Sequence, residues 1–277
     1  MAPLLVSLGL VGVALASVDT RAVVDRLSAL RPGWLLAAVA LGPMQVALGG
    51  WRWARVARGL GIPLRTAPAI AEYGLSTGLN QVLPSGIAGD AVRVWRQRHH
   101  HGLVQATHAA VVDRALGLAS LLGVTALSLP LWPAGEGALT RALAVVALAA
   151  VGAGGLLSPA GRATRALLRR DGWAQLGVSL ALTASFVVGF GLSGLALGVP
   201  PGRWCLTGVP WLLLAMAVPL SFAGWGVREA SAALVWPWLG RTPEEGVAVA
   251  AVYGLSVLLG ALPGLVFWGW YRPEGAT

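Results

Sequence analysis

Charged side chains are rare in this 277-residue chain, and several of them stand beside glycine and proline within apolar stretches. The clusters are Asp90 with Arg93, Asp113 with Arg114, Arg228 with Glu229, and the isolated Glu72. A guanidinium group binds phosphate through two parallel hydrogen bonds, and nearby carboxylates would keep an empty site close to neutral. The clusters could therefore hold an anionic phosphate group, since ionisable residues at membrane depth are costly and tend to be functional. They could equally be interfacial charges that pair locally.

Neighbouring residues on a helix do not face one another, so the two members of each adjacent pair need different partners. For the first two clusters the simplest solution is a pair of crossed ion pairs. These are Arg114 with Asp90, and Arg93 with Asp113. The same reasoning predicts that Arg228 and Glu229 turn to separate partners.

Two related breaks carry these clusters. Residues 84–93 (PSGIAGDAVR) and 219–228 (PLSFAGWGVR) lie 135 positions apart and share proline, Ala-Gly and Val-Arg at the same offsets. Glycine permits sharp turns and proline removes a backbone donor, so neither stretch favours a continuous helix. Paired interruptions in corresponding halves of a membrane protein point to a polar site between them. The alternative is two ordinary turns outside the membrane, where proline and glycine are also common.

The elements that must position these breaks are membrane helices. Only 11% of the residues are charged, against about 25% in a typical soluble domain. Uncharged runs of about 20 residues recur along the chain, which is the length that a bilayer core requires. We therefore predict an all-α, polytopic transmembrane bundle with six or seven spans and two broken or re-entrant segments, which could form a two-fold internal repeat. Residues 1–277 would form a single membrane domain, with a first half (1–140) broken at 84–93 and a second half (141–277) broken at 219–229.

The net charge is +9. The chain contains no lysine, so its 20 cationic residues are all arginines. The arginines are dense at 52–65, 93–101 and 162–170, between apolar runs, rather than gathered in one basic patch. This distribution is typical of cytoplasmic loops and contacts with anionic lipid headgroups, and it argues against a nucleic-acid partner. The single Cys205 excludes an internal disulfide, and we expect no metal ion or other cofactor.

Three ordered blocks resemble a known family. They are Asn80-Gln81-Val82-Leu83-Pro84-Ser85-Gly86-x-x-Gly89-Asp90-x-x-Arg93, then Val112-Asp113-Arg114-x-x-Gly117-Leu118, then Pro219 through Gly224-x-Gly226-Val227-Arg228-Glu229. They are similar to the transmembrane region of the lysylphosphatidylglycerol synthases and of its stand-alone, flippase-like relatives. The resemblance implies a multi-pass protein of the bacterial cytoplasmic (inner) membrane that is associated with moving lipids between leaflets. In the full-length synthases a soluble aminoacyl-transfer domain follows, and since this chain stops at Thr277 we expect that activity to be absent.

The expected function is to bind an anionic lipid headgroup between the two breaks and to move it across the bilayer. Arg93, Arg114 and Arg228 would contact the headgroup, and Asp90, Asp113 and Glu229 would hold or release these arginines. The full set of expected substrate-binding residues is Asn80, Pro84, Gly86, Gly89, Asp90, Arg93, Asp113, Arg114, Pro219, Gly224, Gly226, Arg228 and Glu229.

Two other functions are compatible with the sequence. The protein could be a non-transporting accessory protein that docks a separate lipid- or glycan-modifying enzyme, and it could assemble as a homo-oligomer. It could also be an intramembrane transferase that acts on a lipid carrier. Against this last function, the sequence contains no metal-binding aspartate pair and no nucleophile–base arrangement, so we expect no enzymatic activity.

Overall fold

The computed structural model describes residues 2–83, 88–132, 162–217 and 221–270. Within these ranges the secondary structure is helical and contains no strand. The elements in chain order are α1 (Ala2–Ala16), α2 (Thr20–Ser28), α3 (Pro32–Gly59), α4 (Thr66–Val82), α5 (Ala88–His101), α6 (Leu103–Ser128), the 3₁₀ turn η1 (Leu129–Leu131), α8 (Arg162–Ala196), α9 (Arg203–Met216), α10 (Val227–Trp238), α11 (Pro243–Ala261) and α12 (Pro263–Trp270). The predicted all-α membrane bundle is confirmed.

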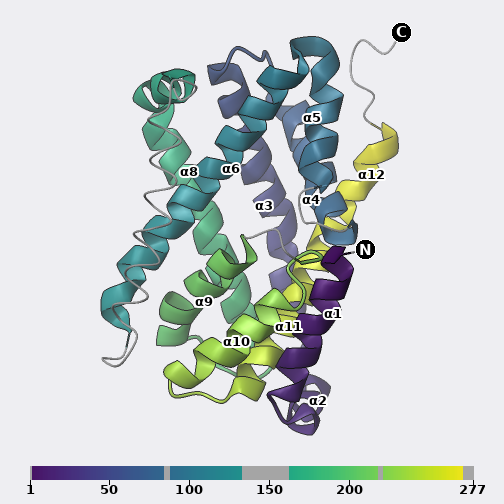
Figure 1. Cartoon of the computed structure of the whole chain (residues 1–277), viewed down its shortest axis with the longest axis vertical. Helices are drawn as coiled ribbons and strands as arrows, with labels where there is room; N and C mark the ends of the chain where they lie inside the picture. Colours follow the sequence, from purple (N-terminus) through teal and green to yellow (C-terminus); the bar gives the residue numbers. More distant parts are fainter. Residues whose placement is uncertain (1, 84–87, 133–161, 218–220, 271–277) are drawn as a thin grey trace.

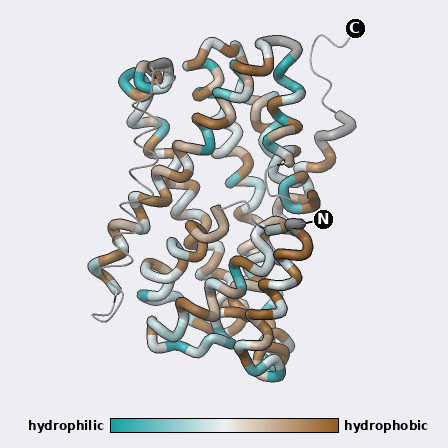
Figure 2. The backbone as a smooth tube through the Cα atoms, in the orientation of Figure 1, coloured by the Kyte–Doolittle hydropathy of each residue, from teal (hydrophilic) through white to brown (hydrophobic). Residues whose placement is uncertain are grey.

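Four helical stretches are long and apolar enough to cross a membrane. They are Pro32–Gly59, Leu103–Leu131, Thr164–Ala196 and Pro243–Val266. The N-terminal pair α1 and α2, bent by 96°, would make a fifth if it counts as one span. The described residues therefore support four or five spans rather than the predicted six or seven. One of the uncharged runs, residues 142–161, lies outside them. Hydrophobic residues run along most of the helices, as Figure 2 shows.

The remaining helices of the bundle form two hairpins that enter it from opposite ends. α4 packs against α5, and α9 packs against α10. These helices have 17, 14, 14 and 12 residues, fewer than the roughly 20 that a full crossing needs. In Figure 1, α4 and α5 occupy the upper half of the bundle and α9 and α10 the lower half.

The order of long and short helices occurs twice along the chain. α3, α4, α5 and α6 have 28, 17, 14 and 26 residues, and α8, α9, α10 and α11 have 35, 14, 12 and 19. In both series the two short helices flank one of the glycine-containing breaks. This order is the one that the predicted internal repeat would require, and the repeat itself stays a prediction.

The arginine-dense stretches are mostly helical, whereas the sequence suggested loops. α3 continues to Gly59, α5 covers 93–101, and α8 begins at Arg162. The helices can continue because some of these arginines have carboxylate partners in other helices, so their charge is not exposed to lipid alone. Arg55 at the end of α3, for example, forms an ion pair with Asp171 near the start of α8. The three stretches lie at the same end of the bundle, the upper one in Figure 1.

Glycines allow the long helices to approach closely. A Cβ atom at Gly42 of α3 would lie 2.6 Å from the carbonyl oxygen of Gly260 in α11. One at Gly264 of α12 would lie 2.1 Å from the carbonyl oxygen of Gly74 in α4. Small residues at crossings of this kind are the usual basis of helix packing in membranes, where van der Waals contact replaces the hydrophobic effect.

The N-terminal helix closes the second hairpin. α1 packs against α10, and the Ser7 hydroxyl oxygen accepts a hydrogen bond of 2.7 Å from the backbone N–H of Phe222. Gly226, with φ of +85°, lies so near that a Cβ atom there would be 2.6 Å from the Ser7 carbonyl oxygen. The turn before α10 is therefore held in place by the start of the chain.

Candidate functional site

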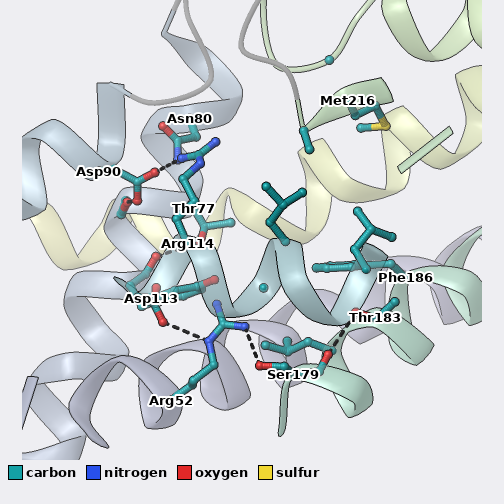
Figure 3. Close-up of a pocket in the computed structure, with 18 of the residues that line it drawn as sticks. Arg52, Thr77, Asn80, Asp90, Asp113, Arg114, Ser179, Thr183, Phe186 and Met216 are labelled. Atoms are coloured by element: carbon teal, nitrogen blue, oxygen red, sulfur yellow. Dashed lines mark hydrogen bonds and ion pairs between the residues drawn. The ribbon is translucent and has the colours of Figure 1, made fainter. Parts of the chain in front are cut away.

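A polar cavity of about 390 Å³ lies where the two hairpins meet. α3, α4, α5, α6 and α8 line it, together with the end of α9 and the turn before α10. Its polar lining residues are Arg52, Tyr73, Ser76, Thr77, Asn80, Gln81, Asp90, Arg93, Asp113, Arg114, Ser179 and Thr183. Figure 3 shows most of these side chains pointing into one space from different helices.

The deepest charge in the cavity is Asp113. It stands in the third turn of α6, where its Oδ1 accepts a hydrogen bond of 2.9 Å from Arg52 Nε. The side chains of Arg52 and Asp113 are only 6% and 3% exposed. Arg52 Nη1 donates in addition to the Ser179 hydroxyl of α8 at 3.2 Å. Gly117, one turn further along α6, leaves room for this guanidinium, because a Cβ atom there would lie 3.3 Å from Arg52 Nη1.

Arg93 links this buried pair to the mouth of the cavity. Its guanidinium lies 3.4 Å from Asp113 Oδ2 and 3.1 Å from Asp90 Oδ1. The ring of Trp53 stacks below it, with 4.2 Å between the guanidinium carbon and the ring centroid. Arg93 Nε has no hydrogen-bond partner among the described residues. Arg93 is therefore held by two carboxylates and an aromatic ring, with one donor still unused.

Asp90 and Arg114 form the outer part of the network. They make an ion pair, and Asp90 also accepts a hydrogen bond of 3.2 Å from the Ser76 hydroxyl. The side chains of Asp90 and Arg114 are 23% and 48% exposed, so this pair is far more accessible than the Arg52–Asp113 pair. Both crossed ion pairs expected from the sequence are confirmed, and Arg93 also forms the local pair with Asp90.

The charged residues that line the cavity carry a net charge of +1. Three are arginines and two are aspartates, which gives +3 − 2 = +1. Because the aspartates already neutralise two of the guanidinium groups, an empty cavity does not hold three unpaired charges. A single monoanion would bring the set to neutrality.

The start of α5 is held against α4 by one hydrogen bond and one close backbone approach. The Asn80 side-chain oxygen, at the end of α4, accepts a hydrogen bond of 2.8 Å from the N–H of Gly89. Gly89 lies so close to α4 that a Cβ atom would be 1.9 Å from the Ser76 carbonyl oxygen. Gly89 is thus required for the close approach of the two helices, and it orients Asp90 without lining the cavity itself.

The wall opposite the aspartates is partly hydroxylated and partly apolar. On α8, the Thr183 hydroxyl donates to the Ser179 carbonyl oxygen at 3.0 Å and lies 2.9 Å from the Ser120 hydroxyl of α6. Leu182 and Phe186 of α8, and Met216 at the end of α9, continue this wall towards the second hairpin. The cavity therefore changes from charged to apolar along its length.

Arg228 and Glu229 lie apart from this cavity and pair with each other. Their closest atoms are 2.8 Å apart, and both side chains are almost fully buried. The expectation that they would seek separate partners is wrong, because Glu229 occupies the first turn of α10 and bends back over its start. Glu229 accepts a hydrogen bond of 2.7 Å from the Gly226 N–H, which brings the carboxylate beside its neighbour. Inside a helix adjacent side chains point in different directions, but in the first turn a carboxylate can fold back towards the free backbone N–H groups at the helix start.

The surroundings of Arg228 complete a closed structural site. The guanidinium lies 4.6 Å from the ring centroid of Trp225 and 5.9 Å from that of Tyr253. A Cβ atom at Gly254 would be 1.9 Å from its Nη2 atom. Arg228 is 1% exposed, so this pair is placed to anchor the start of α10 rather than to meet a ligand in the cavity.

The structure therefore distributes the expected site residues over several places. Asn80, Asp90, Arg93, Asp113, Arg114 and Gly224 line the cavity. Gly89 supports it from behind, and Gly226, Arg228 and Glu229 belong to the second, buried cluster. Pro84, Gly86 and Pro219 lie outside the described residues. Of the second break, Ala223 and Gly224 reach the cavity, and Gly224 has a φ of +80°.

Several cavity residues were not expected from the sequence. Tyr73, Ser76 and Thr77 lie seven, four and three positions before the expected Asn80 on α4, so a helical spacing of polar residues could have indicated this face. Arg52 carried no such signal, because it follows an apolar run and precedes further arginines. It could be identified only through Asp113, its partner 61 residues later.

The comparisons with known proteins gave one match. The family model described as "Lysylphosphatidylglycerol synthase TM region" matches residues 1–264. Neither the curated proteins nor the solved structures gave a match. The matched region contains every described residue that lines the cavity.

Proposed function

The chain belongs to the lysylphosphatidylglycerol synthase TM region family, and from this premise we propose that it binds the anionic headgroup of a phospholipid in the polar cavity and moves it between leaflets. The observation that carries the proposal is the arrangement of three guanidinium groups around two carboxylates in the middle of a membrane bundle. Unwound backbone and buried charge at such a position need a polar ligand, water or protein partners, because lipid chains supply none. The position between two hairpins of opposite entry supports access from both sides.

The exchange of partners at Arg114 is the central step of this function. A phosphate that reaches the cavity would replace Asp90 as the partner of Arg114, the most exposed of the three arginines. Arg93 would supply a second positive group, including its unused Nε donor. Asp113 would hold Arg52 and Arg93 in position throughout. When the headgroup leaves, Asp90 would take its place again, so no covalent bond is made or broken and the protein needs no enzymatic activity.

The setting of this function is the bacterial cytoplasmic membrane, with the arginine-rich end of the bundle facing the cytoplasm. The clustering of 52–59, 93–101 and 162–170 at one end supports this orientation through the positive-inside rule. Its partners would be membrane lipids with anionic headgroups.

The direct test is a leaflet-resolved assay in vesicles that contain the purified protein and a trace of fluorescent phosphatidylglycerol. An impermeant reductant bleaches the outer leaflet, and further bleaching then reports lipid arriving from the inner one. Arg114→Gln should slow this phase by about tenfold or more, because a charged hydrogen bond contributes about 1.5–3 kcal/mol. Arg21→Gln, an exposed arginine of α2, is the matched control and should retain the wild-type rate. Bleaching with folded wild-type protein that is no faster than in protein-free vesicles would refute lipid movement.

A further inference from the structure

A buried carboxylate lies directly behind the wall of the polar cavity. Glu72 is 3% exposed and stands one turn before the cavity-lining Ser76 on α4, so it is close to the cavity without lining it. Both of its carboxylate oxygens accept hydrogen bonds from Gln97 Nε2 of α5, at 2.8 and 2.7 Å. Keeping an acid ionised at such a buried position costs free energy. The exchange of partners proposed for the headgroup makes no use of this acid.

The spacing of residues on α5 connects Glu72 to the charged network. Asp90, Arg93 and Gln97 follow one another at three and four positions and therefore share one face of α5. At one end of this face Asp90 contacts Ser76 of α4, and at the other end Gln97 contacts Glu72. Arg93 stands between these contacts along the helix, and its charge acts on Glu72 as well as on Asp90. An anion that binds to Arg93 therefore changes the electrostatic surroundings of Glu72.

The remaining surroundings of Glu72 add one further cation. Arg96 of α5 acts on the carboxylate, and the group that α3 presents to it is the neutral indole of Trp53. The arginines of α3 contact other groups; they are Arg52, Arg55 and Arg58. α12 and α11 also pack against α4, and α12 contains no titratable residue. The titratable residues of α11 have contacts elsewhere; they are Glu244, Glu245 and Tyr253.

Gln97 can satisfy both protonation states of Glu72. An amide has two N–H donors and a carbonyl acceptor, whereas a guanidinium group can only donate. With Glu72 ionised, the amide donates to the carboxylate, as the structure shows. With Glu72 protonated, Nε2 would donate to the carbonyl oxygen of the acid and Oε1 would accept from its O–H. Asp90 and Asp113 differ, because guanidinium groups within 3.5 Å favour their ionised forms.

We propose that Glu72 takes up a proton when an anionic headgroup binds at Arg93, so that one proton and one anion enter the protein together. This inference rests on the proposed function and adds a driving force to it. Before the anion arrives, Arg93 and Arg96 favour the ionised carboxylate. The negative charge of a phosphate at Arg93 opposes this effect, and a proton from water then joins a carboxylate oxygen of Glu72. The two together add no net charge, and a pH difference across the membrane would bias lipid movement.

The test measures how headgroup binding depends on pH. Glycerophosphoglycerol, a phosphodiester whose single negative charge does not change near neutral pH, is titrated into the purified full-length protein in an isothermal calorimeter. Repeating the titration in buffers of different ionisation enthalpy gives the number of protons taken up. Glu72→Gln is uncharged at every pH and can still form an amide pair with Gln97. Glu244→Gln is the matched control, because it removes a carboxylate of α11 outside the cavity.

We expect the wild type to bind the probe up to about tenfold more tightly for each unit by which the pH falls, with about one proton taken up. Glu72→Gln should bind at neutral pH as tightly as the wild type does at acid pH, without proton uptake. The Glu244→Gln control should behave as the wild type does.

Binding to the wild type without proton uptake would refute the proton site and leave the headgroup site standing, and this result does not depend on any variant folding. Proton uptake that persists in folded Glu72→Gln and disappears in Asp90→Asn would also refute it, because Asp90 would then be the acid that titrates. If the wild type binds no probe at any pH, the proposed function itself fails.

Discussion

Neutralising Asp113 should destabilise the protein more than neutralising any partly exposed acid. In Asp113→Asn the amide keeps the shape of the side chain but removes its charge. Among the described residues Arg52 would then have only neutral acceptors, such as the Ser179 hydroxyl, whereas Arg93 would retain Asp90. One almost fully buried guanidinium would thus lose its counter-charge.

The magnitude follows from the burial of the pair. Breaking a buried ion pair by removing one partner costs about 3–5 kcal/mol, because the remaining charge is left desolvated. The matched control is Asp171→Asn, which also removes an aspartate that pairs with an arginine of α3. There the side chains of Asp171 and Arg55 are 16% and 33% exposed, and such a pair contributes about 1 kcal/mol or less once solvent screening is considered. The two variants should therefore differ by about 2–5 kcal/mol.

The assay is reversible unfolding of the purified protein in mixed micelles, with the free energy of unfolding compared between the variants. A second variant provides the internal check. Removing the stranded charge in the double variant Arg52→Gln/Asp113→Asn should recover part of the loss, which measures the coupling of the pair. An equal cost for Asp113→Asn and Asp171→Asn would contradict the reasoning, since it would mean that water in the cavity screens Asp113 as well as it screens an exposed acid.

Two further predictions concern glycines. Gly254→Ala should lower the free energy of unfolding by about 3 kcal/mol, because the added Cβ would overlap the buried guanidinium of Arg228. The control is Gly123→Ala, where a Cβ would meet nothing within 4 Å; it should be neutral or stabilise by about 0.5–1 kcal/mol. Comparable melting of both variants in detergent would contradict this. Gly89→Ala should push α5 away from the Ser76 carbonyl. A cysteine pair placed across α4 and α5 should then crosslink more slowly than the same pair in a protein that keeps Gly89. Unchanged crosslinking would show that the hairpin tolerates the added methyl group.

The fold class could be predicted because it depends on composition. A chain with so few charges and recurrent apolar runs has little alternative to a helical membrane bundle. The pairing of Arg114 with Asp90 could also be predicted. Arg114 and its neighbour Asp113 do not face each other on a helix, so each needs a partner on another helix. These conclusions need only local geometry and charge.

The helix limits could not be predicted, because they depend on partners far away in the sequence. The sequence around Arg55 predicts a loop, because the carboxylate that pairs with it, Asp171, lies 116 positions later. Hydropathy assigns such an arginine to water, whereas the folded bundle gives it an ion pair near the end of α3. The separation of Arg228 from the cavity was equally hidden, since it depends on Glu229 bending back to the Gly226 N–H. The charged residues of two breaks with the same pattern thus have different roles. Asp90 and Arg93 of the first break line the cavity, whereas Arg228 of the second anchors the start of α10.

The contact between Ser7 and Phe222 has a consequence for the order in which the protein is made. The two residues are 215 positions apart, and α1 packs against α10, which is completed still later. At about 5–20 residues per second, the ribosome needs roughly 10–40 s to synthesise the intervening chain. During that interval the first helix sits in the membrane without its native neighbour. Its docking is therefore among the last steps of assembly, and the biogenesis of the second hairpin, rather than the insertion of the N-terminus, sets when the bundle is complete.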